Sequence, residues 1–172
     1  MATTILTYNK MQSIKACSKN NKKELETFIE EVEFAKIRPL LGDDIYNAIL
    51  ADSNASPVDP EVQEILDGGL YKCIAYYVYA RYIQESMLVD TFTGVVRKDR
   101  TDSSTAPVGQ LKNVANEYTE MAMMAFKLVE CKIQAKYGHP KEETRSNFSE
   151  IIGVRRDYCR KKGLEFKINY FK

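Results

Sequence analysis

The sequence lacks the residue patterns that mark most catalytic and metal-binding centres. Its single histidine, His139, cannot build a metal site from several imidazoles, and no Gly-x-Ser-x-Gly motif accompanies it. The four cysteines never occur as a Cys-x-x-Cys pair, and we expect them to be reduced thiols that act as small apolar residues. We therefore predict that the protein is not an enzyme and that it has no catalytic residue, no metal ligand and no cofactor.

Phosphate loops and membrane segments are also missing. The pair Gly68–Gly69 is not followed by the Gly-Lys-Ser/Thr of a phosphate-binding loop. No apolar run approaches the roughly 20 residues that span a bilayer, so we expect no membrane partner. The formal net charge of +1 argues against a protein dedicated to coating DNA.

A helix over residues 61–87 is expected to organise the fold. Asp59 and Pro60 precede it as an N-cap and a first helical residue. Gly68 and Gly69 interrupt it, and because glycine costs about 1 kcal/mol relative to alanine inside a helix, we expect a kink or a break there. The apolar and aromatic face is wider than one packing partner would bury. Its main stripe consists of Val62, Ile65, Leu66, Leu70, Ile74, Tyr77, Val78, Arg81 and Tyr82.

A second long helix is predicted over residues 110–137, with Gly138 at its end. We expect it to pack against the first long helix as an antiparallel pair. Three methionines beside its apolar stripe are expected to fill the core: Met121, Met123 and Met124. The residues predicted to meet across the pair are Ile74, Tyr77 and Val78 on one helix and Val114, Tyr118 and Ala122 on the other.

The chain before these helices is predicted to be extended over residues 1–21 and helical over residues 22–37. Pro39 is expected to end or kink that helix near Ile37, because proline disfavours helical conformation in the residue before it. A short helix over residues 45–50 follows. The residues assigned to the buried face of the earlier helix are Leu25, Phe28, Ile29, Val32 and Ala35. Those assigned to solvent are Glu26, Glu30 and Glu33.

The segment Thr91–Gln110 cannot continue a helix, because it contains glycine, proline and many serines and threonines. At about 20 residues it is longer than most connections, and loops of this length are usually functional or disordered. Residues around Gly94 are expected to form a small hairpin, followed by an exposed tip. This tip carries three basic residues: Arg97, Lys98 and Arg100.

The last 32 residues differ from the rest in charge and pattern. Residues 141–172 carry nine Lys or Arg and five Asp or Glu, whereas the preceding part carries a slight negative excess. Residues 147–162 favour a short helix with Phe148, Ile151, Ile152 and Cys159 on its inward face. Residues 164–170 alternate strictly between apolar and polar, which predicts a single β-strand. Its candidate partners within the chain are residues 3–8 and 92–97. The strand either folds back onto one of these segments or, as we expect, pairs with another chain.

These elements predict a mainly α protein, a bundle of four to five helices with a long inter-helix loop and a C-terminal arm ending in a short strand. The expected parts are an extended N-terminal segment over residues 1–21, a helical domain over residues 22–140 and an arm over residues 141–172. A single domain with an appendage agrees with the usual size of domains.

The local sequence also resembles a known family. The run Glu33-Phe-Ala-Lys-Ile-Arg-Pro-Leu-Leu-Gly-Asp-Asp-Ile-Tyr46, the tyrosine-rich helix and the Thr93-Gly-Val-Val96 loop resemble head–tail connector (adaptor) proteins of tailed bacteriophages. The similarity is greatest to those of Bacteroidales and crAss-like phages, and it covers about residues 22–137.

The resemblance implies a helical virion protein that is synthesised in the host cytoplasm and resides at the portal vertex. Such proteins form a ring, here expected to contain twelve subunits, between the portal and further tail or ring proteins. The arm would bind the portal or a neighbouring subunit, and the basic loop would face the channel and contact phage DNA transiently. The residues expected to bind the partner are Arg155, Arg156, Leu164, Phe166, Ile168 and Tyr170. Those expected in the channel loop are Arg97, Lys98 and Arg100.

Two other classes of function remain open at this point. A small intracellular nucleic-acid-binding or regulatory protein would use the basic residues 97–100 and 155–162, and its affinity for DNA would depend on salt. A helical enzyme would need a deep pocket with convergent polar groups, for which the sequence offers no cluster of candidates.

Overall fold

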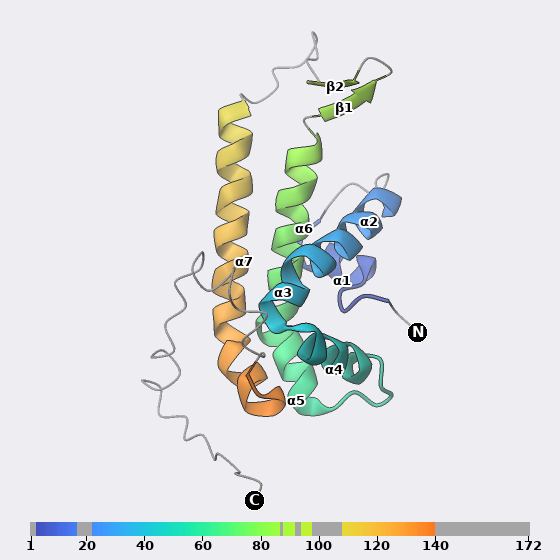
Figure 1. Ribbon diagram of the computed structural model, residues 1–172, viewed down its shortest axis with the longest axis vertical. Helices are drawn as coiled ribbons and strands as arrows, with labels where there is room; N and C mark the ends of the chain where they lie inside the picture. The colour runs from blue at the N-terminus through green and yellow to red at the C-terminus, as the bar shows by residue number, and fades with distance from the viewer. Residues whose placement is uncertain (1–2, 17–21, 87, 92–93, 98–107, 140–172) are drawn as a thin grey trace, which may run out of the picture.

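The fold is that of a computed structural model, which describes residues 3–16, 22–86, 88–91, 94–97 and 108–139. This part of the chain is mainly helical, which confirms the expected fold class at that level (Figure 1). The arm over residues 141–172 lies outside the described residues. The elements, with η for a π-helical turn, are α1 (Tyr8–Ile14), α2 (Lys22–Val32), η2 (Glu33–Ile37), α3 (Arg38–Leu41), α4 (Asp43–Ser53), α5 (Pro60–Ile65), η3 (Leu66–Leu70), α6 (Tyr71–Ser86), β1 (Leu88–Thr91), β2 (Gly94–Arg97) and α7 (Val108–Tyr137).

The two long helices α6 and α7 lie side by side along the long axis of the molecule (Figure 1). Gly69 lies against Ala125, and further along α6 the ring of Tyr79 lies 4.6 Å from that of Tyr118. Because residue numbers rise along one helix as they fall along the other, the pair is antiparallel, as predicted. Of the six residues predicted to meet across the pair, four are buried in the main core: Ile74, Tyr77, Val78 and Ala122. The other two, Val114 and Tyr118, are partly buried and pack against a second, smaller cluster.

The predicted helix over residues 61–87 is present as α5, η3 and α6. Asp59 caps it by accepting a hydrogen bond from the Glu61 N–H at 3.0 Å, and Pro60 is the first helical residue. The predicted kink is confirmed, since Gly69 has a non-helical backbone with φ 176° and ψ −26°. Arg81 departs from the predicted stripe, because its side chain is exposed and its guanidinium pairs with Glu31 and Glu85.

The N-terminal segment is not simply extended, contrary to prediction. Residues Tyr8–Ile14 form α1, which begins at an N-cap threonine, Thr7, and buries Met11 completely. Ile5 and Leu6 are also buried in the main core. The segment therefore belongs to the folded body rather than preceding it.

Of the two outcomes predicted for the helix before Pro39, an end or a kink near Ile37, the structure excludes the end. The wide turn η2 follows α2, and the backbone N–H of Arg38 donates to the carbonyl of Glu33 five residues earlier. Pro39 then falls in the first turn of α3, where a missing N–H is tolerated because helix N-termini lack intrahelical acceptors for their first donors. The chain remains helical to Leu41 and reverses at Gly42.

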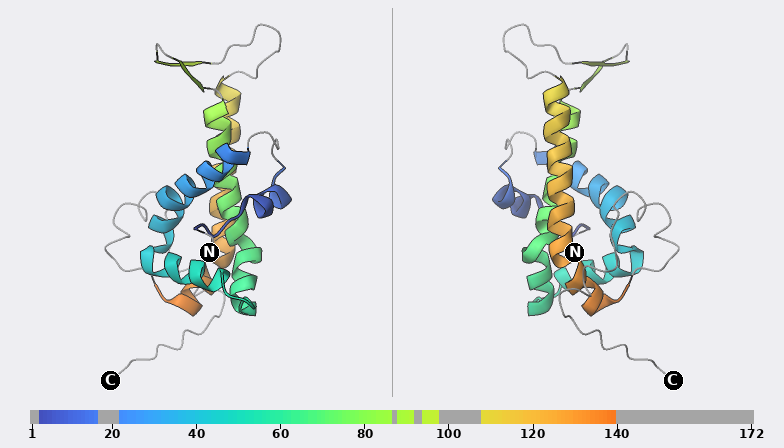
Figure 2. Two further views of the ribbon diagram at one scale, coloured as in Figure 1. Left: turned by 90° about the vertical axis from the view of Figure 1, so that its right-hand side faces the viewer. Right: turned by 90° about the vertical axis from the view of Figure 1, so that its left-hand side faces the viewer.

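One main core joins α1 to α5 with the lower parts of α6 and α7. Figure 2 shows that α1 to α4 lie beside the α6–α7 pair, so α7 keeps one side away from the other helices. Cys73 is a free thiol at the centre of this core, and burial raises its pKa to about 12. Cys131 is bonded in a disulfide, which corrects the expectation of a reduced thiol at that position.

Charged pairs join the end of α7 to α5. The Lys136 ammonium contacts the carboxylates of both Asp59 and Glu61, and Lys132 contacts Glu64. The Lys136 ammonium holds the pKa of Asp59 below its ordinary value. The Tyr137 hydroxyl donates to Asp52 at 2.7 Å. These contacts fix the C-terminal end of α7, from which the undescribed arm departs.

The α6–α7 pair continues beyond the main core, and we call this part the extension. Its small separate core consists of Ala80, Ile83 and Ala115, with partly buried aromatic and aliphatic residues around them. The strands β1 and β2 form an antiparallel hairpin beyond the end of α6, with Val89 opposite Val96 (Figure 1). The hairpin predicted around Gly94 is thus confirmed in its backbone.

Candidate interaction surfaces

The described residues contain no group of three or more His, Cys, Asp or Glu side chains arranged to hold a metal ion. In the same part of the chain, no helix is long and apolar enough to cross a membrane. His139 lies exposed just after α7. The features with distinctive chemistry are a buried carboxylate, a cluster of tyrosines and an apolar face of α7.

The buried carboxylate belongs to Glu33, which was predicted to face solvent. Its side chain is only 1% exposed. One carboxylate oxygen accepts from the Leu6 N–H at 2.8 Å, and the other accepts from the Ile5 N–H at 2.9 Å and from the hydroxyl of Tyr46. Burial raises the pKa of Glu33 above its ordinary value, and these hydrogen bonds oppose that rise.

Glu33 therefore joins the N-terminal segment to α4 across the core. Burial and the neighbouring carboxylate raise the pKa of the Tyr46 hydroxyl in turn, so it remains a donor. The guanidinium of Arg38 lies 4.6 Å from the centre of the Tyr46 ring. The role of the carboxylate is structural, since two backbone N–H groups and one hydroxyl of the protein donate to its oxygens. The sequence carried a signal for it, because Glu33 follows the buried Ile29 by four residues and so shares its helix face.

The tyrosine cluster lies in the extension. The ring of Tyr118 is 5.9 Å from that of Tyr76 and 4.6 Å, edge-on, from that of Tyr79. Lys15, just after α1, donates to the Tyr118 hydroxyl at 2.6 Å and lies 4.6 Å from the centre of the Tyr79 ring. The aromatic residues that we predicted around α6 therefore contact α7 on one side and Lys15 of the N-terminal segment on another. The three tyrosines remain half-buried.

The side of α7 opposite the core carries exposed apolar residues. This corrects the prediction that Met121 and Met124 fill the core, whereas Met123 packs against the main core as predicted. Met121, Met124 and Leu128 are 42%, 64% and 67% exposed. Because they follow one another at intervals of three and four residues, they form one stripe along the helix. Two exposed acidic residues, Glu117 and Glu120, precede them on the same side, and we call these five residues the outer face of α7.

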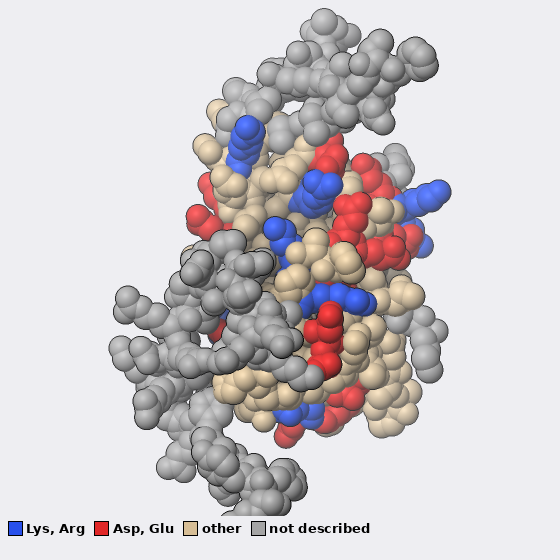
Figure 3. Space-filling model, viewed as in Figure 1, with Lys and Arg blue, Asp and Glu red and all other residues tan. Residues whose placement is uncertain are grey.

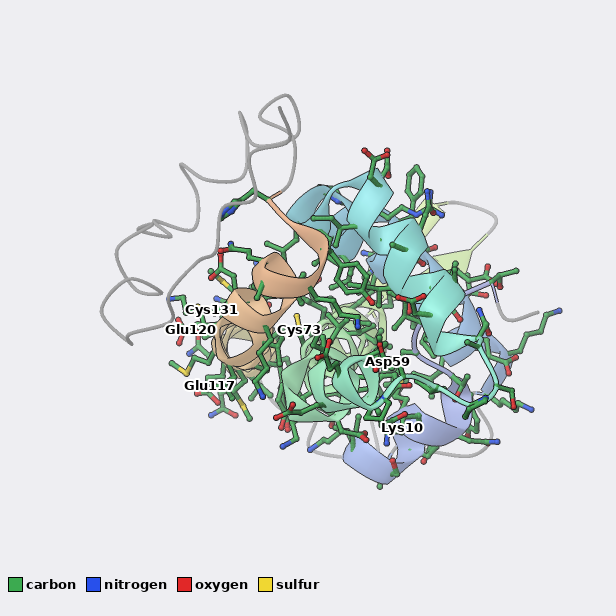
Figure 4. All side chains as sticks on the ribbon, turned by 90° about the horizontal axis from the view of Figure 1, so that it is seen from below. Lys10, Asp59, Cys73, Glu117, Glu120 and Cys131 are labelled. Carbon is green, nitrogen blue, oxygen red and sulfur yellow. The ribbon has the colours of Figure 1, made fainter. Side chains whose placement is uncertain are left out.

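Figure 4 shows the outward position directly. Glu117, Glu120 and Cys131 lie on the side of α7 that points away from the other helices, whereas Cys73 lies in the interior, among the helices. Within the described residues, neither Glu117 nor Glu120 forms an ion pair. The outer face is thus acidic toward the start of α7 and apolar toward its middle.

The face of the molecule shown in Figure 3 carries charged side chains of both signs. Acidic side chains gather over α2, whose exposed acids are Glu24, Glu26, Glu30 and Glu31, and Lys and Arg side chains are scattered among the acids. On the described part of this face, no continuous basic patch of the kind that binds a nucleic-acid backbone is present.

The site residues predicted from the sequence fall almost entirely outside the described residues. Arg97 is the last residue of β2, while Lys98 and Arg100 lie in the undescribed loop. The six residues assigned to partner binding lie in the undescribed arm: Arg155, Arg156, Leu164, Phe166, Ile168 and Tyr170. Their assigned roles remain predictions.

Comparison with protein families identifies one match. A model of a family of unknown function, DUF6712, matches residues 37–132, more than half of the chain, and the chain therefore belongs to this family. No curated protein and no solved structure matches the chain.

Proposed function

We propose that this member of the DUF6712 family is a structural subunit of the head–tail connector of a tailed bacteriophage and has no catalytic role. The observation that carries the proposal is the extension. A helix pair that continues beyond the main core, with its own small core and half-buried tyrosines, suits a subunit that buries this surface against neighbours. The resemblance of the run Glu33–Tyr46 to connector proteins supplies the identity of the assembly.

The subunits would form a ring, for which we propose twelve copies, through head-to-tail contacts. Such contacts use two different surfaces of each subunit and close when the rotation between neighbours divides a full turn. The β1–β2 hairpin lies beyond the end of α6, and in this role we propose that the hairpin and residues 98–107 face the channel or the next protein along the axis. Arg97, Lys98 and Arg100 would then contact phage DNA transiently, since three charges provide little affinity at physiological salt.

The arm would connect the ring to the portal. Residues 164–170 would add as a strand to an exposed sheet edge, with main-chain hydrogen bonds providing affinity. Leu164, Phe166, Ile168 and Tyr170 occupy alternate positions, so they would lie on one face of that strand and enter pockets of the partner. Arg155 and Arg156 would contact acidic groups beside it.

The experiment is binding to the portal ring of the phage that encodes the chain. The full chain and a variant without residues 163–172 are compared in pull-down, native mass spectrometry and electron microscopy. We expect the full chain to form a ring on the portal and the truncated chain to remain folded, by circular dichroism, but not to dock. Ile168→Pro should behave almost as the truncation does, because proline removes a backbone donor from a paired strand. Lys167→Pro is the matched control. It removes the backbone N–H of the neighbouring residue, which points to the opposite edge of the strand, so comparing the two variants shows which edge pairs with the partner.

Two results would overturn the proposal. If the truncated chain docks with the affinity of the full chain, the arm does not connect it to the portal. If the full chain neither forms rings nor binds the portal, but binds DNA with an affinity that falls steeply with salt, the protein is a nucleic-acid-binding protein instead.

A further inference from the structure

We propose that residues 147–162 form a helix that docks against the outer face of α7 of the same chain. The apolar stripe of that face and its acidic end provide the binding surface, and a basic amphipathic segment that begins shortly after α7 provides the occupant. This docking concerns an isolated chain, and it holds whether or not the protein forms a connector ring.

The apolar stripe needs a partner because its residues are large, adjacent and exposed. Met124 and Leu128 each expose about two thirds of their surface, at 64% and 67%, and Met121 exposes 42%. Single exposed apolar residues are normal on proteins, but a continuous stripe of them usually marks a contact surface. An amphipathic helix is the simplest partner for such a stripe on another helix, because ridges of side chains fit into grooves.

The chain that follows α7 has the right length to return along it. The nine residues 138–146 span about 30 Å when fully extended, so a helix that follows them can begin beside Leu128, about 14 Å back along α7 from Tyr137. A helix over residues 147–162 would be about 24 Å long at 1.5 Å per residue. A helix of this length that begins beside Leu128 would run back along α7 past Met124, Met121, Glu120 and Glu117.

The pattern of residues in that segment agrees with the pattern of the outer face. Phe148, Ile151 and Ile152 lie in its first half, which in this antiparallel arrangement runs beside Leu128 and Met124. Its last residues are basic, namely Arg160, Lys161 and Lys162. They would arrive beside Glu117 and Glu120, the two acids that form no ion pair within the described part of the chain.

Charge complementarity therefore fixes the direction of docking as well as the surface. A parallel arrangement would place the basic residues beside Lys132 and Lys136, near the end of α7, where like charges repel. The antiparallel arrangement places apolar residues against apolar ones and basic residues against acidic ones. Residues 164–170 would then emerge beside the extension, still available to another protein.

The test is hydrogen exchange of the full chain, measured by mass spectrometry in the presence of a thiol reductant. The reductant ensures that the disulfide at Cys131 does not hold any segment in place. We expect the backbone amides of residues 147–162 to exchange at least about tenfold more slowly than those of an unstructured peptide of the same sequence. This protection should be constant over about a hundredfold range of protein concentration, because binding within one chain does not depend on concentration.

Two pairs of variants test the surface. Leu128→Asp should abolish the protection, whereas the adjacent Lys127→Asp should not, because the two exposed side chains point about 100° apart around the helix. Glu117→Lys with Glu120→Lys should weaken the protection, and Glu24→Lys with Glu30→Lys on α2 should leave it unchanged. Thermal unfolding of α7 itself is followed in each variant, and we expect it to be nearly unaltered, since all these positions are exposed.

Each alternative result overturns the proposal. Rapid exchange throughout residues 147–162 would mean that the segment does not dock. Protection that increases with protein concentration would show that a second copy, rather than the same chain, covers the outer face. Protection that survives Leu128→Asp in a folded chain would place the segment on another surface.

Discussion

The contact between Gly69 and α7 allows a sharp test of the packing of the two long helices. A Cβ atom added at Gly69 would lie 2.3 Å from the carbonyl oxygen of Ala125 and 3.1 Å from a methyl group of Val129. Ordinary contacts begin at 3.4 Å, so Gly69→Ala would force α7 away by about 1 Å. The oxygen belongs to the backbone and cannot rotate aside, unlike the end of a flexible side chain.

The cost can be estimated from the behaviour of overpacked cores. Adding atoms to a well-packed interior typically costs about 1–3 kcal/mol, and a rigid backbone neighbour places this variant in the upper part of that range. In a protein of this size each kcal/mol shifts the melting temperature by about 2–4 °C, so we expect a decrease of about 4–12 °C. Chemical denaturation followed by circular dichroism gives the free energy of unfolding directly.

Gly68 provides a matched control. A Cβ atom there would meet only the Val129 methyl group, at 3.3 Å, and the residue is exposed. Gly68→Ala should therefore change stability little, because the gain in helix propensity of about 1 kcal/mol offsets a slight crowding. If Gly69→Ala is as stable as Gly68→Ala, to within about 0.5 kcal/mol, the helices do not meet at Gly69 and the reasoning is wrong.

Three further predictions concern the core, its buried carboxylate and the long loop. Ile74→Ala should cost about 2–5 kcal/mol in denaturant titration, since Ile74 is completely buried, and a loss below about 0.5 kcal/mol would show that it is not core. Glu33 has a pKa raised above 4.5 by burial, so the folded state binds its proton more tightly than the unfolded state, and stability should fall as the pH rises from about 4.5 through the folded pKa. Glu33→Gln should remove that decrease and, because its NH₂ group would oppose a backbone donor, lower stability by about 1–3 kcal/mol; an unchanged pH profile in unfolding experiments would contradict this. Deleting residues 98–106 should leave the melting temperature nearly unchanged, because loop closure depends weakly on length, and a large decrease would assign this loop to the fold.

The long helices were predictable because their signals are local and repeated. In the stripes from Val62 to Val78 and from Leu111 to Ile133, apolar residues recur at helical spacing over several turns. Gly138 marks the end of the second helix, because its φ of 84° is a left-handed conformation that glycine adopts easily. The same periodicity does not tell which polar residues lie inside. Glu33 shares a face with Leu25 and Ile29, but its burial depends on the N–H groups of Ile5 and Leu6, which lie far away in the sequence.

The N-terminal helix and the exposed stripe of α7 were missed for a related reason. Tyr8–Ile14 is too short for a periodic signal, and it is stabilised by packing against α2 and α6 rather than by its own propensity. Met121, Met124 and Leu128 are apolar, and only the arrangement of the helices shows that they face away from the core. Most of the predicted site lies in the loop and the arm, outside the described residues, so those predictions remain to be tested.

The packing at Gly69 also bears on assembly, because the same helix pair forms both the core and the extension. Tyr118 lies seven residues, about 10 Å along α7, from Ala125. A displacement of α7 by about 1 Å at Ala125 would therefore alter how Tyr118 meets Tyr79 and Lys15, which it contacts at 4.6 Å between ring centres and at 2.6 Å. The surface that the extension presents to neighbours thus depends on a glycine far from it. A Gly69→Ala chain that still folds should for that reason assemble less well than a Gly68→Ala chain, even below the melting temperature of both.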